Sequence, residues 1–96
     1  MTRRDRVLIK HREAILGAAA ANKATSIALV GSVARGDDGP DSDYDFVATF
    51  EPGATSFDIG GLLADLEDLL GGDVDVLDVG GLKARRTEVL AEAITL

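Results

Sequence analysis

The sequence predicts an α/β fold, built as one domain over residues 1–96, from three observations. Short apolar runs rich in β-branched residues predict about three strands. Longer segments with apolar residues at helical spacing predict about three helices, or four with one short helical turn. The second and third strands flank a helix, which predicts a right-handed crossover between parallel strands.

The expected strands follow from composition and turn signals. The first run is apolar and closes at Gly31, and the second follows a polar loop that contains Gly39-Pro40. The third comes after Gly71-Gly72 and alternates valine with aspartate. The three strands are expected at residues 26–30, 43–50 and 73–79.

The expected helices have one apolar side each. Ser56 is a suitable N-cap for the second helix, and Gly71-Gly72 ends it. The third is expected to carry Leu82, Val89, Leu90 and Ala93 inward. The three helices are expected at residues 4–21, 56–70 and 82–94.

A glycine-serine turn follows the first strand. Gly31 lets the backbone turn tightly and allows a ligand to approach, which a Cβ would hinder. If residues 32–35 form a helical turn, their N–H groups make an anion-binding nest, with the Ser32 hydroxyl as a further donor. Arg35 could then hold a phosphate oxygen with its fork of donors.

Two aspartates open the second strand. Asp43 and Asp45 are two positions apart, so they share a strand face, while Tyr44 points the other way and is expected in the core. Two like charges this close repel unless a cation lies between them. Mg²⁺ takes few protein carboxylates and fills its other positions with water and phosphates, and phosphoryl-transfer sites often hold two such ions about 3.5–4 Å apart. The order of these residues therefore predicts a nucleotide-handling site.

A third carboxylate is expected on the third strand. Asp75 is central and lies between two valines, whereas Asp73 and Asp78 lie at the strand ends and are expected in solvent. Asp75 is therefore the predicted third metal ligand. It could instead be a surface carboxylate.

Simpler interpretations of the polar residues also stay open. Asp43 and Asp45 could be ordinary acids at a loop edge, and Arg35 could pair only with Asp37 or Asp38. His11, the one histidine, is expected at the surface.

These residues resemble a known family. Gly-Ser-x-Ala-Arg-Gly at 31–36, Ser-Asp-x-Asp at 42–45 and Val-Asp-Val at 74–76 resemble the minimal nucleotidyltransferases of the DNA polymerase β-like superfamily, and among them the MntA-type antitoxins. The resemblance covers nearly the whole chain. It implies an α+β nucleotidyltransferase fold with a small mixed sheet packed against helices. Val30 departs from the family, where Phe often precedes the Gly-Ser pair, and should alter packing rather than chemistry.

The resemblance also implies an activity. It is a Mg²⁺-dependent transfer of AMP from ATP to a hydroxyl, in the related antitoxins a tyrosine of a cognate HEPN ribonuclease toxin. Asp43 and Asp45 would bind metal, and Asp75 would bind the ion that activates the attacking hydroxyl. Gly31 and Ser32 would hold the triphosphate, with Arg35 assisting. No segment remains for an acceptor-binding domain, so we expect another molecule to present the acceptor.

Charge is unevenly distributed along the chain. The formal net charge is −7, and residues 37–80 hold thirteen acids and no base. Such a surface repels a nucleic-acid backbone and suits a basic protein partner or divalent cations. Cysteine is absent, no apolar run approaches the roughly 20 residues that span a bilayer, and no signal core follows the start, so cytoplasm is the expected location.

Two further functions are compatible with the sequence. The first is that of a non-catalytic antitoxin that neutralises its partner by forming a complex. With either function, so small a domain could form a homo-oligomer or a hetero-oligomer with the toxin. The second is that of a nucleotidyltransferase for small molecules, which is weaker because no second domain would hold the acceptor.

Overall fold

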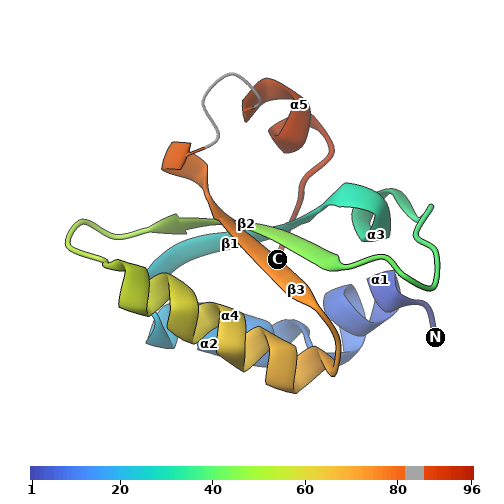
Figure 1. Cartoon of the computed structure of the whole chain (residues 1–96), viewed down its shortest axis with the longest axis horizontal. Helices are drawn as coiled ribbons and strands as arrows, with labels where there is room; N and C mark the ends of the chain where they lie inside the picture. The colour runs from blue at the N-terminus through green and yellow to red at the C-terminus, as the bar shows by residue number, and fades with distance from the viewer. Residues whose placement is uncertain (82–85) are drawn as a thin grey trace.

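The computed structural model describes residues 1–81 and 86–96. Within them, a mixed sheet has the strand order β3-β2-β1-β4 (Figure 1). Strand β1 (Ala24–Val30) lies antiparallel to both β2 (Tyr44–Phe50) and β4 (Ile94–Thr95), and β3 (Val74–Asp78) lies parallel to β2. The predicted α+β fold with a small mixed sheet is confirmed, as is the parallel pairing across the crossover.

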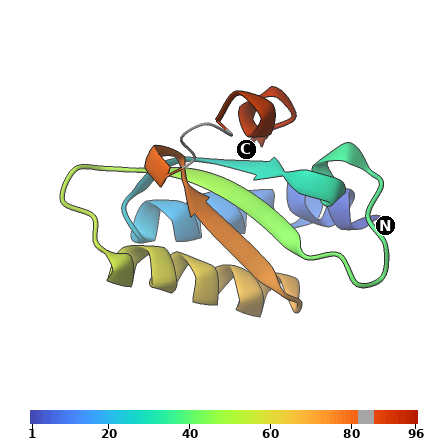
Figure 2. The ribbon, with the colours of Figure 1, turned by 45° about the horizontal axis from the view of Figure 1, so that its top comes forward.

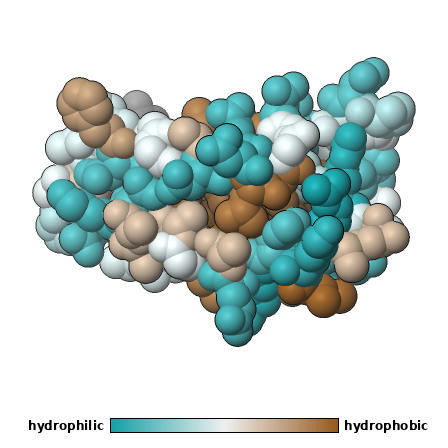
Figure 3. Space-filling model, turned by 90° about the horizontal axis from the view of Figure 1, so that it is seen from below, coloured by the Kyte–Doolittle hydropathy of each residue, from teal (hydrophilic) through white to brown (hydrophobic). Residues whose placement is uncertain are grey.

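The helices are divided between the two faces of the sheet. Helices α2 (Arg12–Ala21) and α4 (Ser56–Leu70) lie side by side on one face, and α5 (Arg86–Ala91) lies on the other (Figures 1 and 2). The main core lies between the sheet and the two long helices, and includes Ile15, Leu29, Phe46, Leu62 and Leu66, all fully buried. Seen from the helical side, the surface is largely hydrophilic around limited apolar areas (Figure 3).

The predicted helix over residues 4–21 is interrupted. A short α1 (Arg3–Asp5) continues into a π-helical turn (Arg6–Lys10), where the His11 N–H donates to the Arg6 carbonyl at 2.8 Å, and α2 begins only at Arg12. The wide turn absorbs one residue. In a regular helix Val7 and Ile15 would point about 80° apart, but with one residue absorbed they differ by only about 20°. Both side chains are consequently fully buried.

Helix α4 has the bounds that the sequence predicted, but a different cap. Thr55, not Ser56, is the N-cap: its hydroxyl accepts from the Phe57 N–H at 3.3 Å, and its own N–H donates to Asp58 at 2.8 Å. This reciprocal pair is a capping box. Gly71 ends the helix in the left-handed conformation, with φ of 67°.

The predicted third helix is shorter than expected. Residues 82–85, which include the predicted core position Leu82, lie outside the described residues. Val89 is buried as predicted, Ala93 is half-buried, and Leu90 is 37% exposed, so its inward placement was wrong. Ile94 belongs to β4, because the chain beyond α5 hydrogen-bonds along the open edge of β1, with the Leu96 N–H donating to the Ile27 carbonyl at 3.0 Å.

The segments around the glycine-serine turn agree with the sequence. Helix α3 (Gly31–Arg35) is the expected short turn, and an irregular polar loop joins it to β2. Tyr44 is buried at 4% exposure, as predicted, while His11 is half-buried rather than exposed. No helix in the described ranges is long and apolar enough to cross a membrane.

Candidate active site

Two of the predicted carboxylates lie side by side on neighbouring strands. Asp45 of β2 and Asp75 of β3 are partners in the parallel register. Side chains at paired positions leave the same face of a sheet, so both carboxylates project from the face opposite the long helices. Both line a cavity of about 230 Å³, whose other walls are Val30, Gly31, Leu77, Val89 and Glu92. The structure therefore brings Asp45 and Asp75 together beside the glycine turn.

Gly31 makes room for the Asp45 carboxylate. Its φ is 77°, in the left-handed region, and a Cβ at this position would lie 2.6 Å from Asp45 Oδ2. Real Cβ atoms do not approach an oxygen so closely. The glycine is thus required twice, by the backbone turn and by the neighbouring carboxylate.

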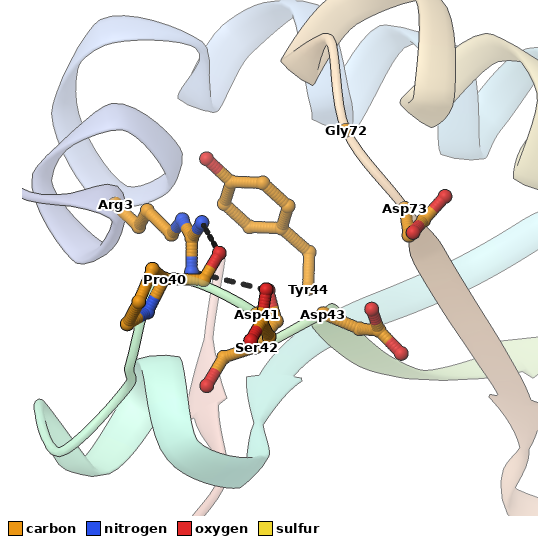
Figure 4. A pocket seen from close by; sticks show the side chains of 8 residues that line it. All are labelled: Arg3, Pro40, Asp41, Ser42, Asp43, Tyr44, Gly72 and Asp73. Atoms are coloured by element: carbon orange, nitrogen blue, oxygen red, sulfur yellow. Dashed lines mark hydrogen bonds between the residues drawn. The ribbon is translucent and has the colours of Figure 1, made fainter.

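Asp43 lies at the mouth of the same strand. It precedes β2 by one residue, is exposed, and lines a second cavity of about 250 Å³ together with Arg3, Tyr44 and Asp73 (Figure 4). In this view its carboxylate points away from Arg3. Asp43 therefore lies near Asp45, just before the N-terminal end of β2, but it borders a different cavity.

The charges of this group act on Asp45. Burial raises the pKa of the Asp45 carboxyl above its ordinary value, and the negative charges of Asp75 and Asp43 raise it further. Arg35 has the opposite, smaller effect. Two acids that repel a third, half-buried carboxylate form with it a site that a cation would stabilise.

The donor set suits an ion whose shell is completed by substrate. Among the residues that the structure describes, no group of three or more histidine, cysteine, aspartate or glutamate side chains lies close enough to hold one ion. Mg²⁺ in phosphoryl-transfer sites uses one or two carboxylates, and waters and phosphates supply the rest. Asp45 and Asp75 fit that pattern as a neighbouring pair.

Glu92 is a residue of this site that the sequence reasoning missed. Its Oε1 accepts from the Gly31 N–H at 3.1 Å, and its Oε2 accepts from Arg35 Nη1 at 2.9 Å. The Arg35 hydrogen bond holds the pKa of Glu92 below its ordinary value. Glu92 is 57 residues from Arg35 in the chain, and no local pattern marks it.

The remaining predicted residues, Ser32 and Arg35, flank the turn. Arg35 pairs with Asp37 at 3.2 Å, as the simpler interpretation of the sequence expected, and also with Glu92, while Asp38 lies near Arg3 instead. Ser32 is half-buried, and its hydroxyl makes no hydrogen bond with another described residue. Asp73 and Asp78 are exposed, as expected, and Asp75 is exposed too, as its alternative interpretation allowed.

Comparisons with known proteins agree with this geometry. The family model of the nucleotidyltransferase domain matches residues 11–94. A solved structure assigned as a minimal nucleotidyltransferase is 42% identical; the match covers 100% of this chain and 97% of that one, with a TM-score of 0.86. A search of curated proteins found no match.

Toxin–antitoxin structures share the fold at lower identity. One, solved with AMP-PNP, is 21% identical with a TM-score of 0.72, and the match covers 86% of this chain and 69% of that one. A mutant of the toxin–antitoxin MntA-HpeT is 22% identical with a TM-score of 0.72, covering 88% and 70%. At this identity the likeness establishes the shared fold.

Proposed function

This chain belongs to the nucleotidyltransferase domain family, and from that premise we propose that it transfers AMP from ATP to a hydroxyl of a protein partner. The acceptor oxygen bonds to the α-phosphorus, the bond from that phosphorus to the bridging oxygen breaks, and pyrophosphate leaves. The acceptor proton passes to solvent. Catalysis of this kind consists mainly of positioning and charge neutralisation.

The main observation in support of the proposal is that Asp45 and Asp75 are partners in the strand register and line one cavity beside the Gly31 turn. In the proposed site, Asp43 and Asp45 would hold Mg²⁺, and Asp75 would hold the ion that activates the attacking hydroxyl. Bound Mg²⁺ would neutralise the phosphate oxygens and favour ionisation of the acceptor. Two ions fit such a transfer.

The turn residues are proposed to hold the triphosphate. Gly31 offers its N–H, Ser32 its hydroxyl and Arg35 its guanidinium. In the structure Glu92 accepts from both Gly31 and Arg35, so these donors already hold a carboxylate. A phosphate would accept from the same donors.

The proposed partner is a toxin of the HEPN ribonuclease class, with a tyrosine as the acceptor, and the proposed role is that of its antitoxin in the cytoplasm. Toxin–antitoxin complexes among the fold neighbours support this role, and one of them was solved with AMP-PNP. Another is a mutant in which two aspartates two positions apart are changed to glutamate, the spacing of Asp43 and Asp45.

A label-transfer experiment tests the proposal. The purified chain is incubated with α-labelled ATP, Mg²⁺ and the product of the adjacent gene. Label should move to the partner, and the Asp43→Asn and Asp45→Asn variants should abolish transfer. Asp75→Asn should still bind nucleotide but lose transfer. The exposed Asp68→Asn on α4 is the charge-matched control and should transfer normally.

The second candidate is a non-catalytic antitoxin that acts by occupying its partner. It is favoured by the open donor set, since no three acids in the described chain converge on one ion. Neutralisation of the partner by Asp43→Asn and Asp45→Asn without transfer of label would establish this candidate. Normal transfer by Asp75→Asn would instead remove Asp75 from the proposed site.

A further inference from the structure

Arg3 connects the start of the chain to the loop before the aspartate pair. Its Nη1 donates to the Gly39 carbonyl at 2.6 Å and to the Ser42 carbonyl at 3.1 Å. Its Nη2 donates to the Pro40 carbonyl at 3.0 Å. Figure 4 shows the guanidinium reaching from α1 across to this loop. One side chain thereby holds three carbonyls of a four-residue segment.

Two further contacts fix the guanidinium itself. Asp38 Oδ2 lies 3.7 Å from Arg3 Nη1, and both side chains are largely shielded, at 30% and 20% exposure. The guanidinium carbon lies 5.9 Å from the centre of the Tyr44 ring, and Tyr44 is buried. A planar, delocalised cation suits a carboxylate on one side and an aromatic face on another, and a lysine ammonium would not reproduce this arrangement.

Beyond the Arg3 contacts, few bonds hold this loop. Residues 36–43 form no helix or strand. At the start of the loop, the Gly36 and Asp37 N–H groups donate to the Ser32 carbonyl, and Asp37 accepts from Arg35. The rest closes a single turn, with the Ser42 N–H donating to the Gly39 carbonyl and the Gly39 N–H donating to the Ser42 hydroxyl. Asp43 follows Ser42 directly. The Ser42 carbonyl belongs to the peptide that joins the two residues, so a hydrogen bond to it orients the backbone of Asp43.

We propose that Arg3 is a positioning residue for the transfer reaction, which holds the 39–42 loop so that Asp43 is aimed at the metal. This inference rests on the proposed function. Arg3 touches no reacting group and acts through the loop backbone. Partners that orient metal ligands typically matter by 10–100-fold in metal affinity or activity, so about tenfold is the expected size here.

The test compares Arg3→Gln and Arg3→Lys with two controls. Arg4→Gln removes the same charge from the next residue, which is exposed and makes no hydrogen bond or ion pair with another described side chain. Thr55→Ala removes the capping box at the far end of α4 and lowers stability away from the loop. The readout is binding of a non-hydrolysable ATP analogue as Mg²⁺ is titrated, followed by kcat and KM for label transfer.

Arg3→Gln should weaken the apparent Mg²⁺ affinity by about tenfold and lower kcat while KM for ATP changes little. Arg3→Lys keeps the charge but cannot reach three carbonyls, so it should lie nearer to Arg3→Gln than to the unaltered protein. Both controls should retain the unaltered Mg²⁺ affinity. The inference would be overturned if Arg3→Gln bound Mg²⁺ as tightly as the unaltered protein, or if Arg3→Lys restored the full Mg²⁺ affinity. It would also be overturned if Thr55→Ala lost as much Mg²⁺ affinity as Arg3→Gln. Failure of both Arg3 variants to fold would also overturn it, because Arg3 would then support the fold as a whole.

Amide hydrogen exchange separates this inference from the proposed function. If the unaltered protein binds no Mg²⁺–nucleotide, the proposed function fails, yet the loop can still be examined. Arg3→Gln should then speed exchange at Gly39 and Ser42, whose N–H groups make the hydrogen bonds of the turn, and Arg4→Gln should not. Unchanged exchange in Arg3→Gln would contradict the role given to Arg3.

Discussion

Gly31 and Asp45 share a space that only glycine leaves open. The Cβ of any other residue at 31 would meet the Asp45 carboxylate, and the φ of 77° adds a conformational cost. The turn and the carboxylate are therefore one unit, although they belong to different elements of the chain.

Gly31→Ala should lower the free energy of unfolding more than Gly36→Ala does. Both positions have φ near 80°, but a Cβ at Gly36 meets nothing within 4 Å. The two variants thus share the cost of a left-handed alanine, and the difference between them isolates the clash, expected at about 1 kcal/mol or more. Urea denaturation measures both. Equal destabilisation would mean that Asp45 moves aside without cost.

The ionisation of Asp45 opposes folding. Because the pKa of Asp45 is raised in the folded protein, by burial first and then by Asp75 and Asp43, the folded state binds more protons than the unfolded chain between the two pKa values. Stability therefore falls as pH rises through that interval. The ionised Asp45 carboxylate, which metal binding would need, therefore lowers the stability of the fold.

Asp45→Asn should accordingly raise the free energy of unfolding at neutral pH, by about 0.5 kcal/mol or more. The gain should vanish in acid, below the ordinary range of a carboxyl, where Asp45 is protonated in both states. Thermal unfolding from pH 3 to 8 measures this. The exposed Asp68→Asn serves as control and should show no such pH-dependent gain. A pH-independent gain would point to packing instead.

Helix α4 shows where sequence patterns are sufficient. Its apolar residues recur at helical spacing and glycines follow it, so both bounds were predicted, and its leucines form much of the core. The cap was misassigned by one residue, because Thr55 and Ser56 are both good caps and only the Asp58 side chain decides between them.

Thr55→Ala should cost about 1 kcal/mol of stability, whereas Ser56→Ala should cost little. The Thr55 hydroxyl accepts from the Phe57 N–H, while no hydrogen bond from the Ser56 side chain to another described residue is present. Chemical denaturation of the two variants measures the difference. Equal losses would restore Ser56 to the role that the sequence suggested.

Short elements and long-range contacts could not be predicted from the sequence. Strand β4 has two residues, too few to show alternation, and it forms because β1 offers an open edge. The π-helical turn leaves no clear mark either, since it arises from the need to bury both Val7 and Ile15. The positions of Asp45 and Asp75 could be predicted because strand periodicity alone places them. Arg3 and Glu92 could not, because their contacts span 39 and 61 residues of chain.

For the molecule as a whole, ligand binding and stability should be coupled. A ligand that binds only the folded state at about 100 times its Kd adds about 2.7 kcal/mol to the free energy of unfolding. A non-hydrolysable ATP analogue with Mg²⁺ should therefore raise Tm by about 10–20 °C. Chelation of the metal with EDTA should abolish most of this shift.

Asp45→Asn provides the matched comparison for that measurement. Without ligand, the Tm of this variant should be higher than that of the unaltered protein. Addition of the ATP analogue with Mg²⁺ should then raise it little. A shift that is the same with and without EDTA, or the same in Asp45→Asn, would contradict metal binding at the neighbouring aspartates.

The contact between Glu92 and the glycine turn ties the site to the tail of the chain. Glu92 is followed within two residues by β4, and that strand is held to β1 through Leu29 and Ala28. Residues 92–96 thus couple the glycine turn to the β1 edge of the sheet. An event that separates β4 from β1 should also draw the Glu92 carboxylate away from Gly31 and Arg35, and so change the site from a distance.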